Sequence, residues 1–345
     1  MKKQIILTLI VAIATSMTVN AQNVALHTNG TTQHFDGPNG LIAAYNESVS
    51  GDTIYLSGGS FTPPANFEKT LSIYGAGHYV DSTMVTGKTF INGNINFKEN
   101  ADNFLIEGAH ITGWVRFDNN ISINNVTFKS SIFNGEVNVQ GDNTNPSKSG
   151  SFIRCVFQGE LKLNNATNFY FSNSIFSEQY ISNSTNNLFE NNIMLVTINT
   201  SANTNYLFRN GHNNTIRNNC IISTGNYSDR ASSNIGDKFY NNLFTHANPY
   251  FGTNPVSVNN YTGVAQADIF EDQTGVYFNY AHDYHLKNTE AYLGTDGTQV
   301  GIYGGVFPYK EGAVPSNPHF QIEEIAPTAA EGKLNVKLKV SAQDN

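Results

Sequence analysis

Residues 171–176 read Phe-Ser-Asn-Ser-Ile-Phe: one apolar residue, three further residues that include asparagine, and then two adjacent apolar residues. The same pattern returns along the chain. Closer copies occupy residues 189–194, 216–221 and 239–244, and looser copies begin at Ile106, Ile123 and Phe152. The seven starts are 17, 29, 19, 18, 27 and 23 residues apart. A period of about 20 in a strand-rich sequence is typical of a solenoid, in which each coil stacks on the previous one.

A second repeat follows another template, in which a glycine is followed by apolar residues two and four positions later. The two repeats are here called the first and second ladders. Its copies, 20, 22 and 24 residues apart, are Gly93-Asn-Ile95-Asn-Phe97, Gly113-Trp-Val115-Arg-Phe117, Gly135-Glu-Val137-Asn-Val139 and Gly159-Glu-Leu161-Lys-Leu163. Side chains alternate across a strand, so the apolar residues are expected inside and the intervening residues outside. Asparagine pairs in the first repeat suit tight turns and bonds from coil to coil. Together the ladders predict an all-β parallel solenoid.

The flanking segments predict caps, because the terminal coils of a solenoid expose apolar surface and a strand edge. Residues 40–49 carry a short amphipathic pattern, which predicts an N-terminal capping helix, and they lead into Gly51-Asp-Thr-Ile-Tyr-Leu56 and Ser72-Ile-Tyr-Gly-Ala-Gly77. At the other end, Asp283-Tyr-His-Leu-Lys287 precedes the glycine-rich residues 294–305.

These opening and closing segments resemble those of secreted right-handed parallel β-helix proteins of the pectin-lyase-like superfamily, of the type found in Bacteroidetes. The resemblance covers about residues 38–306. It implies a right-handed parallel β-helix. It leaves the activity open, because that superfamily contains lyases, hydrolases and non-catalytic surface proteins. We interpret His285 and Asp296 as parts of the closing segment rather than as catalytic groups.

The predicted boundaries divide the chain into four parts. Residues 1–21 combine a basic start, an apolar run too short to span a bilayer and a small-residue cleavage site, which predicts a signal peptide. Residues 22–50 form the predicted N-terminal cap and residues 51–306 the parallel β-helix. Residues 307–345 hold four prolines and then the alternating residues 334–340, which predict a linker and one C-terminal strand tail.

Charge and cysteine content limit the partners and the location. The 345 residues carry a formal charge of −8 without a cluster of Lys and Arg, which argues against nucleic acid as a partner. We expect an exported monomer, periplasmic, on the outer surface or extracellular, without a transmembrane segment. Cys155 and Cys220 lie three coils apart in the predicted register, about 14 Å, which exceeds the ~7 Å limit for a disulfide. We therefore expect two unpaired thiols.

The second ladder defines one outward face of the solenoid. Its first column holds Asn94, Trp114, Glu136 and Glu160, and its second column holds Asn96, Arg116, Asn138 and Lys162. Neighbours within a column should lie about 4.8 Å apart at the backbone. An exposed indole at Trp114 stacks well on a sugar ring. The alternative is that a loop such as residues 141–150 covers the indole. We predict ligand contacts from Trp114, Arg116, Glu136, Asn138, Glu160 and Lys162.

Glu136 and Glu160 carry like charges at a distance where they repel. A shared proton, a bound cation or bridging by Arg116 and Lys162 would each relieve the repulsion. A shared proton suits acid–base hydrolysis, whereas Ca²⁺ held by Glu136, Glu160 and Asn138 suits a lyase, in which Lys162 or Arg116 takes a proton from an acidic sugar. A solvated ladder of ion pairs without a chemical role is the simplest alternative.

A second group of candidates is Arg209, His212 and Arg217. A Gly-His pair before a later arginine is similar to the pectin-hydrolysing β-helix enzymes, but their paired aspartates and their Arg-x-Lys are absent here. The patterns Trp-x-Asp-His and Arg-x-Pro-x-x-Arg of pectate lyases are also absent.

Three functions follow from these observations. The leading expectation is a secreted or surface-exposed, non-catalytic β-helix protein that binds polysaccharide on its outward sheet face and needs no cofactor. The second is a polysaccharide lyase that acts on a uronate-containing glycan through Glu136, Glu160, Arg116 and Lys162, with Ca²⁺ as its metal. The third is a structural or adhesive spacer module.

Overall fold

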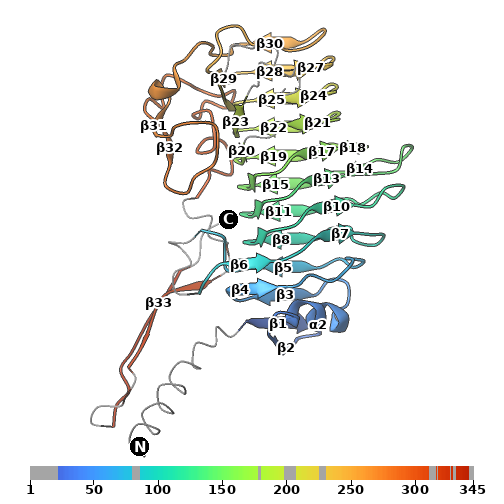
Figure 1. The fold of residues 1–345 in the computed structure, drawn as a ribbon, viewed down its shortest axis with the longest axis vertical. Helices are drawn as coiled ribbons and strands as arrows, with labels where there is room; N and C mark the ends of the chain where they lie inside the picture. The colour runs from blue at the N-terminus through green and yellow to red at the C-terminus, as the bar shows by residue number, and fades with distance from the viewer. Residues whose placement is uncertain are drawn as a thin grey trace, which may run out of the picture.

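The computed structural model describes residues 22–79, 86–177, 180–197, 207–224, 231–310, 316, 318–326, 328 and 332–341, so the predicted signal peptide lies outside the described residues. These residues form an all-β parallel solenoid whose coils stack in one direction (Figure 1). Its strands line up in three long sheets, here called A, B and C. Among the described residues, no helix is long and apolar enough to cross a membrane.

Sheet A has 12 strands, of which all from β3 onward are parallel. In spatial order they are β2 (Thr31–Asp36), β1 (Asn23–Thr28), β3 (Thr53–Leu56), β5 (Ser72–Tyr74), β8 (Leu105–Glu107), β11 (Thr127–Lys129), β15 (Ser151–Ile153), β19 (Tyr170–Ser172), β22 (Leu188–Glu190), β25 (Thr215–Arg217), β28 (Lys238–Tyr240) and β30 (Val256–Val258).

Sheets B and C are parallel throughout. Sheet B consists of β4 (Gly59–Phe61), β6 (Thr89–Ile91), β9 (His110–Ile111), β12 (Ile132–Phe133), β16 (Val156–Phe157), β20 (Ile175–Ser177), β23 (Ile193–Thr197), β26 (Cys220–Thr224) and β29 (Leu243–Phe244). Sheet C consists of β7 (Ile95–Phe97), β10 (Val115–Phe117), β13 (Val137–Val139), β17 (Leu161–Leu163), β21 (Ile181–Ser182), β24 (Phe208–Arg209) and β27 (Ala231–Ser232).

The remaining elements are short. β14 (Ser147–Lys148) pairs with β18 (Ala166–Thr167), β31 (Phe270–Asp272) with β32 (Asp283–Leu286), and β33 (His319–Ile325) with β34 (Val336–Ser341). The helices among the described residues are α2 (Gly40–Glu47) and the 3-10 turn η2 (Gln266–Asp268). Helix α2 lies at the β1 end of the stack, where Leu41 and Ala44 are fully buried (Figure 1).

The interior is filled by phenylalanine columns that follow the strand register. Phe128, Phe152, Phe171 and Phe189 of sheet A stack with ring centroids 5.0, 5.1 and 4.8 Å apart. The register corrects one predicted copy of the repeat, because Phe128 rather than Ile123 aligns with Ile106 and Phe152. Ile123 is buried in the corner before β11. Because a buried corner residue is also apolar, the sequence pattern does not distinguish it from the first residue of a repeat.

Asparagine pairs form the corner between sheets A and B, and the two members of each pair have different roles. The first member, as at Asn191 and Asn218, adopts φ of 55° and 59°, which asparagine tolerates better than most residues. The second members form a buried ladder, in which the side-chain amide of Asn192 donates to Asn219 at 3.0 Å and that of Asn219 donates to Asn242 at 2.9 Å. The predicted coil-to-coil asparagine bonds are therefore confirmed.

The closing segment differs from its prediction. Residues 264–310, here called the covering segment, lie beside the stack of coils rather than over its end (Figure 1). They bury an outward apolar column of sheet B that consists of Ile132, Val156, Ile175, Ile193, Cys220 and Leu243. The coils end at β30, where Val256 and Val258 are 40% and 43% exposed.

The C-terminal strand also differs. Residues 336–341 pair with β33 in an antiparallel hairpin, so the predicted single strand has a partner that the sequence did not reveal. Figure 1 shows this hairpin extending away from the coils, and Val336, Leu338 and Val340 are 46–55% exposed. Cys155 and Cys220 are buried and unpaired, as predicted, and lie three coils apart.

Candidate functional site

The predicted face lies on the outward side of β10, β13 and β17 in sheet C. Val115, Val137 and Leu161 pair in register and point into the core, so the residues that flank them point outward. Arg116, Asn138 and Lys162 share one row of this register. Trp114, Glu136 and Glu160 precede the strands by one position in each coil. The structure therefore brings all six predicted side chains to one face, here called the sheet C face.

Lys162 bridges the two carboxylates. Its Nζ lies 2.6 Å from Glu136 Oε2 and 3.2 Å from Glu160 Oε2, and Arg116 Nη2 lies 4.0 Å from Glu136 Oε1. Of the three ways to relieve the repulsion, the structure shows the bridging cation. The hydrogen bond to Glu136 raises the pKa of Lys162, so the ammonium stays charged at neutral pH.

Trp114 is the only tryptophan of the chain and is 40% exposed, so residues 141–150 do not cover it. The Arg116 guanidinium lies 4.6 Å from the centre of the indole ring, within the range of a cation–π contact. The backbone N–H of Trp114 donates to Asn94 Oδ1 at 3.1 Å. These contacts hold the indole in place while leaving part of its surface open to solvent.

A chain of amides, which the sequence did not reveal, continues from this face. The Asn210 side chain donates to Asn183 at 3.2 Å, Asn183 to Asn164 at 2.6 Å, Asn164 to Asn138 at 3.0 Å, and Asn138 to Glu136 Oε1 at 3.1 Å. All four amides point the same way, because a carboxylate only accepts and so orients the last amide. A signal was present: Asn183 and Asn210 each directly follow a sheet C strand.

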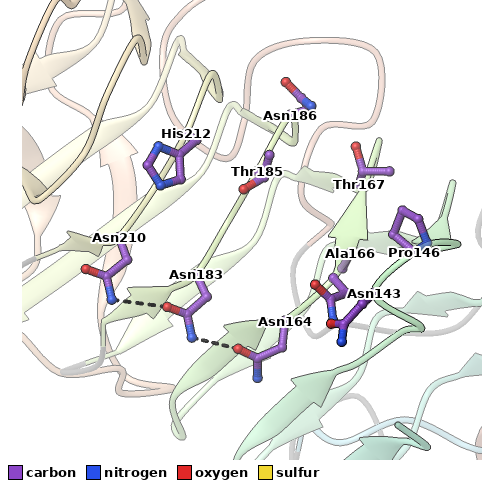
Figure 2. Close-up of a pocket in the computed structure, with 11 residues that line it drawn as sticks. Asn143, Pro146, Asn164, Ala166, Thr167, Asn183, Thr185, Asn186, Asn210 and His212 are labelled. Carbon is purple, nitrogen blue, oxygen red and sulfur yellow. Dashed lines mark hydrogen bonds between the residues drawn. The ribbon is translucent and has the colours of Figure 1, made fainter. Parts of the chain in front are cut away.

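A shallow groove of about 560 Å³ runs beside this amide chain. In Figure 2, Asn164, Asn183 and Asn210 form one row and Thr167, Thr185 and His212 lie along the other side. Thr185 and His212 pair between adjacent coils, which sets the spacing of that second row. The groove is lined by amides, hydroxyls, an imidazole and small side chains, so it offers both hydrogen-bond donors and acceptors without a formal carboxylate.

The second predicted group does not form one site. Arg209 ends β24 of sheet C, and His212 lines the groove. Arg217 lies in sheet A, where its Nε is 2.7 Å from Glu190 Oε1. Three residues that are close in sequence are therefore separated by the corners of one coil.

At the predicted calcium site, the structure places the ammonium group of Lys162. Glu136, Glu160 and Asn138 do lie together, but the Lys162 ammonium occupies the position between the carboxylates. A calcium ion at this place would have to displace that ammonium. In the part of the chain that the structure describes, no group of three or more His, Cys, Asp or Glu side chains is arranged to hold a metal ion.

Comparison with known proteins adds no family: no protein-family model, curated protein or solved structure matches this chain. The structure shares a parallel β-solenoid with the family that the opening and closing segments resemble. A fold does not define an activity, so the function is inferred from the sheet C face.

Proposed function

We propose that this protein is an exported, non-catalytic β-solenoid protein that binds polysaccharide on the sheet C face and in the adjoining groove. One observation carries the proposal. The Asn164–Asn138 hydrogen bond joins the face around Trp114 to the amide groove, so one polar surface continues over the neighbouring strands β10, β13, β17, β21 and β24.

The chemistry of this surface suits a sugar chain. Sugar hydroxyls both donate and accept, and the row of amides offers both functions at each coil. The open part of Trp114 provides an apolar plane for a sugar ring. The Arg116 side chain is 48% exposed and is available to an acidic substituent. A ligand that runs along the stack would meet a similar set of groups at each coil.

The proposal includes the finer features of the fold. We propose a right-handed solenoid of the pectin-lyase-like type found in Bacteroidetes, because parallel strands are almost always joined by right-handed crossovers. Helix α2 would act as its N-terminal cap, which the burial of Leu41 and Ala44 supports. Export is supported by the sequence pattern of residues 1–21.

The lyase alternative has no comparable support. A base must be able to accept a proton near neutral pH, whereas the contact with Glu136 raises the pKa of Lys162. The guanidinium of Arg116 only donates hydrogen bonds and has no acceptor atom to take a proton. We therefore propose binding rather than catalysis for this face.

A glycan array tests the proposal with the full chain, Trp114→Ala and Tyr55→Ala. Tyr55 is a matched control because it is 41% exposed and lies on sheet A. The wild type and Tyr55→Ala should bind the same glycan, and Trp114→Ala should bind at least about tenfold more weakly, a loss of about 1.4 kcal/mol. Since Trp114 is the only tryptophan, its fluorescence should also shift with the ligand.

Two outcomes would overturn this proposal. If the wild type and Trp114→Ala both bind no glycan, the result favours the spacer function. If incubation with uronate polymers, with or without Ca²⁺, produces an unsaturated sugar that absorbs in the ultraviolet, the protein is a lyase.

A further inference from the structure

A second cavity lies between the covering segment and sheet B, away from the sheet C face. Its volume is about 480 Å³. The solenoid contributes Tyr79 and Ile175 to its wall, and the covering segment contributes the rest of the lining. Its aromatic residues from the covering segment are Phe278, Tyr280, Tyr284, Tyr303 and Tyr309.

Three pairs of these aromatic rings meet at steep angles, whereas Phe278 and Tyr284 lie nearly parallel, 6.2 Å apart at 6°. Tyr79 and Tyr280 are 4.9 Å apart at 70°, and Phe278 and Tyr280 are 4.8 Å apart at 76°. On the other side, Tyr303 and Tyr309 are 6.2 Å apart at 89°. Such edge-to-face pairs present some ring faces and some ring edges to the space between them.

The hydroxyls of three of these tyrosines are already engaged. The Tyr79 hydroxyl donates to the carbonyl of Tyr280 at 3.0 Å, and the Tyr280 hydroxyl donates to the carbonyl of His78 at 3.0 Å. The Tyr284 hydroxyl accepts from the N–H of Asn279 at 3.1 Å and donates to the carbonyl of Asn279 at 3.5 Å. The surface that these tyrosines present to the cavity therefore consists mainly of aromatic rings and not of hydrogen-bond donors.

One carboxylate lines the cavity. Asp283 Oδ1 accepts from the N–H of His285 at 2.9 Å, and this bond lowers the pKa of Asp283, so the group is ionised at neutral pH. His285 Nδ1 also lies 2.7 Å from Asp283 Oδ1. Burial lowers the pKa of nearby His78 to about 3, so that imidazole is neutral. Lys88 Nζ lies 4.8 Å from the Tyr280 ring centre, so this ring already takes part in one cation–π contact.

We propose that this cavity binds a quaternary ammonium compound, of the trimethylammonium class to which choline belongs. The cation is attracted by the faces of the tyrosine and phenylalanine rings and by the Asp283 carboxylate. Its methyl groups form no hydrogen bonds, so they need none of the donors that the tyrosines have committed elsewhere. A saccharide of the same size needs those donors for its hydroxyl oxygens. This inference is independent of polysaccharide binding at the sheet C face.

The first experiment titrates the full chain with choline and with 3,3-dimethyl-1-butanol, its uncharged counterpart of the same shape, by isothermal calorimetry. Choline should bind saturably and the alcohol at least about tenfold more weakly, because only the charge differs. Equal binding of the two compounds would overturn the proposal, as would the absence of saturable choline binding at tens of millimolar.

The second experiment compares variants. Asp283→Asn removes the carboxylate, Tyr303→Leu removes one ring, and Asp268→Asn is the control, because it removes an equal charge from the covering segment outside the cavity. The first two should lower choline affinity by about tenfold or more, and Asp268→Asn should bind as the wild type does. Circular dichroism verifies the fold of each variant.

Unchanged choline affinity in a folded Asp283→Asn variant would overturn the proposal, and that variant decides the matter if Tyr303→Leu does not fold. A monosaccharide that binds the wild type but not Asp283→Asn would also overturn it, since the cavity would then be a sugar site.

Discussion

At the scale of single residues, Lys162 determines the state of the sheet C face. Its ammonium lies within 3.2 Å of both glutamates, whose side chains are only 24% and 15% exposed. Without it, two carboxylates in adjacent coils would face each other with Arg116 Nη2 4.0 Å from one of them. We predict that Lys162→Gln lowers the free energy of unfolding at pH 7 by about 1–2 kcal/mol.

The pH dependence of this loss has a definite sign. The glutamates raise the pKa of Lys162 in the folded state, so its contribution is fully present below the ordinary value of 10.5 and disappears as the pH rises through the folded-state value. Urea denaturation at pH 7 and pH 11 should therefore show a smaller difference between variant and wild type at pH 11. Lys148→Gln is the control, because Lys148 Nζ donates to Asn145 Oδ1 at 3.3 Å and forms no ion pair among the described residues.

The Lys162→Gln variant should also respond to calcium. Removal of the ammonium leaves two carboxylates without the cation that they share, and carboxylate oxygens are ligands that Ca²⁺ prefers. Millimolar Ca²⁺ should raise the unfolding midpoint of Lys162→Gln more than that of the wild type. An equal response of the two proteins would show that the glutamates do not form a latent metal site.

The residues of this face were predictable because they depend on two rules only, alternation along a strand and one register between coils. The bridge by Lys162 was one of three open alternatives, since side-chain rotamers decide it. The amide chain was not predicted, because Asn164, Asn183 and Asn210 come from corners whose course the repeat does not specify.

At the scale of elements, the buried asparagine ladder holds the corner between sheets A and B. Asn219 Oδ1 accepts from the backbone and side chain of Asn192, and its amide donates to the carbonyl of Phe189 at 3.0 Å. We predict that Asn219→Ala costs about 2–4 kcal/mol, because it leaves several buried polar groups without partners. Asn260→Ala, at the partly exposed end of the ladder, should cost about 1 kcal/mol. Chemical denaturation of both variants measures the difference, and similar losses would mean that burial does not set the cost of removing a member of the ladder.

The covering segment was the main feature that the sequence left unrecognised. The repeat ends in two adjacent apolar residues, such as Ile175-Phe176 and Ile193-Met194, and adjacent residues of a strand point to opposite faces. One member of each pair therefore has to point outward, and six coils place these residues in one apolar column. This column was a signal for a covered face, but nothing in the repeat identifies which distant segment covers it.

Contact between the covering segment and sheet B predicts a selective effect on one thiol. Burial raises the pKa of both cysteines, to about 12 for Cys155, so neither should react with iodoacetamide in the folded protein. Gly301 has φ of +80°, and a Cβ there would lie 3.0 Å from Cys220 Sγ. We predict that Gly301→Val lifts the covering segment and increases the labelling of Cys220, while Cys155 inside the coils stays protected.

Gly297→Val is the matched control for this experiment. Gly297 has φ of +79°, close to that of Gly301, but a Cβ there meets nothing within 4 Å. Mass spectrometry of the labelled peptides separates the two thiols. Equal labelling of Cys220 in both variants would assign the effect to backbone strain, and labelling of Cys155 at the same rate would indicate global unfolding.

At the scale of the whole molecule, sheets B and C have different surroundings. Sheet C is open and polar, sheet B is closed by the covering segment, and the phenylalanine columns fill the space between the sheets. The hairpin β33–β34 is separate from this arrangement, since Leu334, Val336, Leu338 and Val340 remain 46–55% exposed. Its first strand escaped prediction because the motif Phe-Gln-Ile-Glu-Glu-Ile breaks strict alternation, and the pairing indeed contains a register shift.

Truncation distinguishes the contributions of these parts to stability. Because a two-stranded hairpin contributes little when it does not pack on a core, removal of residues 319–345 should change the thermal midpoint by no more than about 2 °C. Removal of residues 264–345 also exposes the apolar column from Ile132 to Leu243 to water, and it should lower the midpoint by more than about 10 °C. Differential scanning calorimetry of the full chain and both truncations measures these shifts. A midpoint that falls equally in both would mean that the hairpin, and not the covering segment, stabilises the coils.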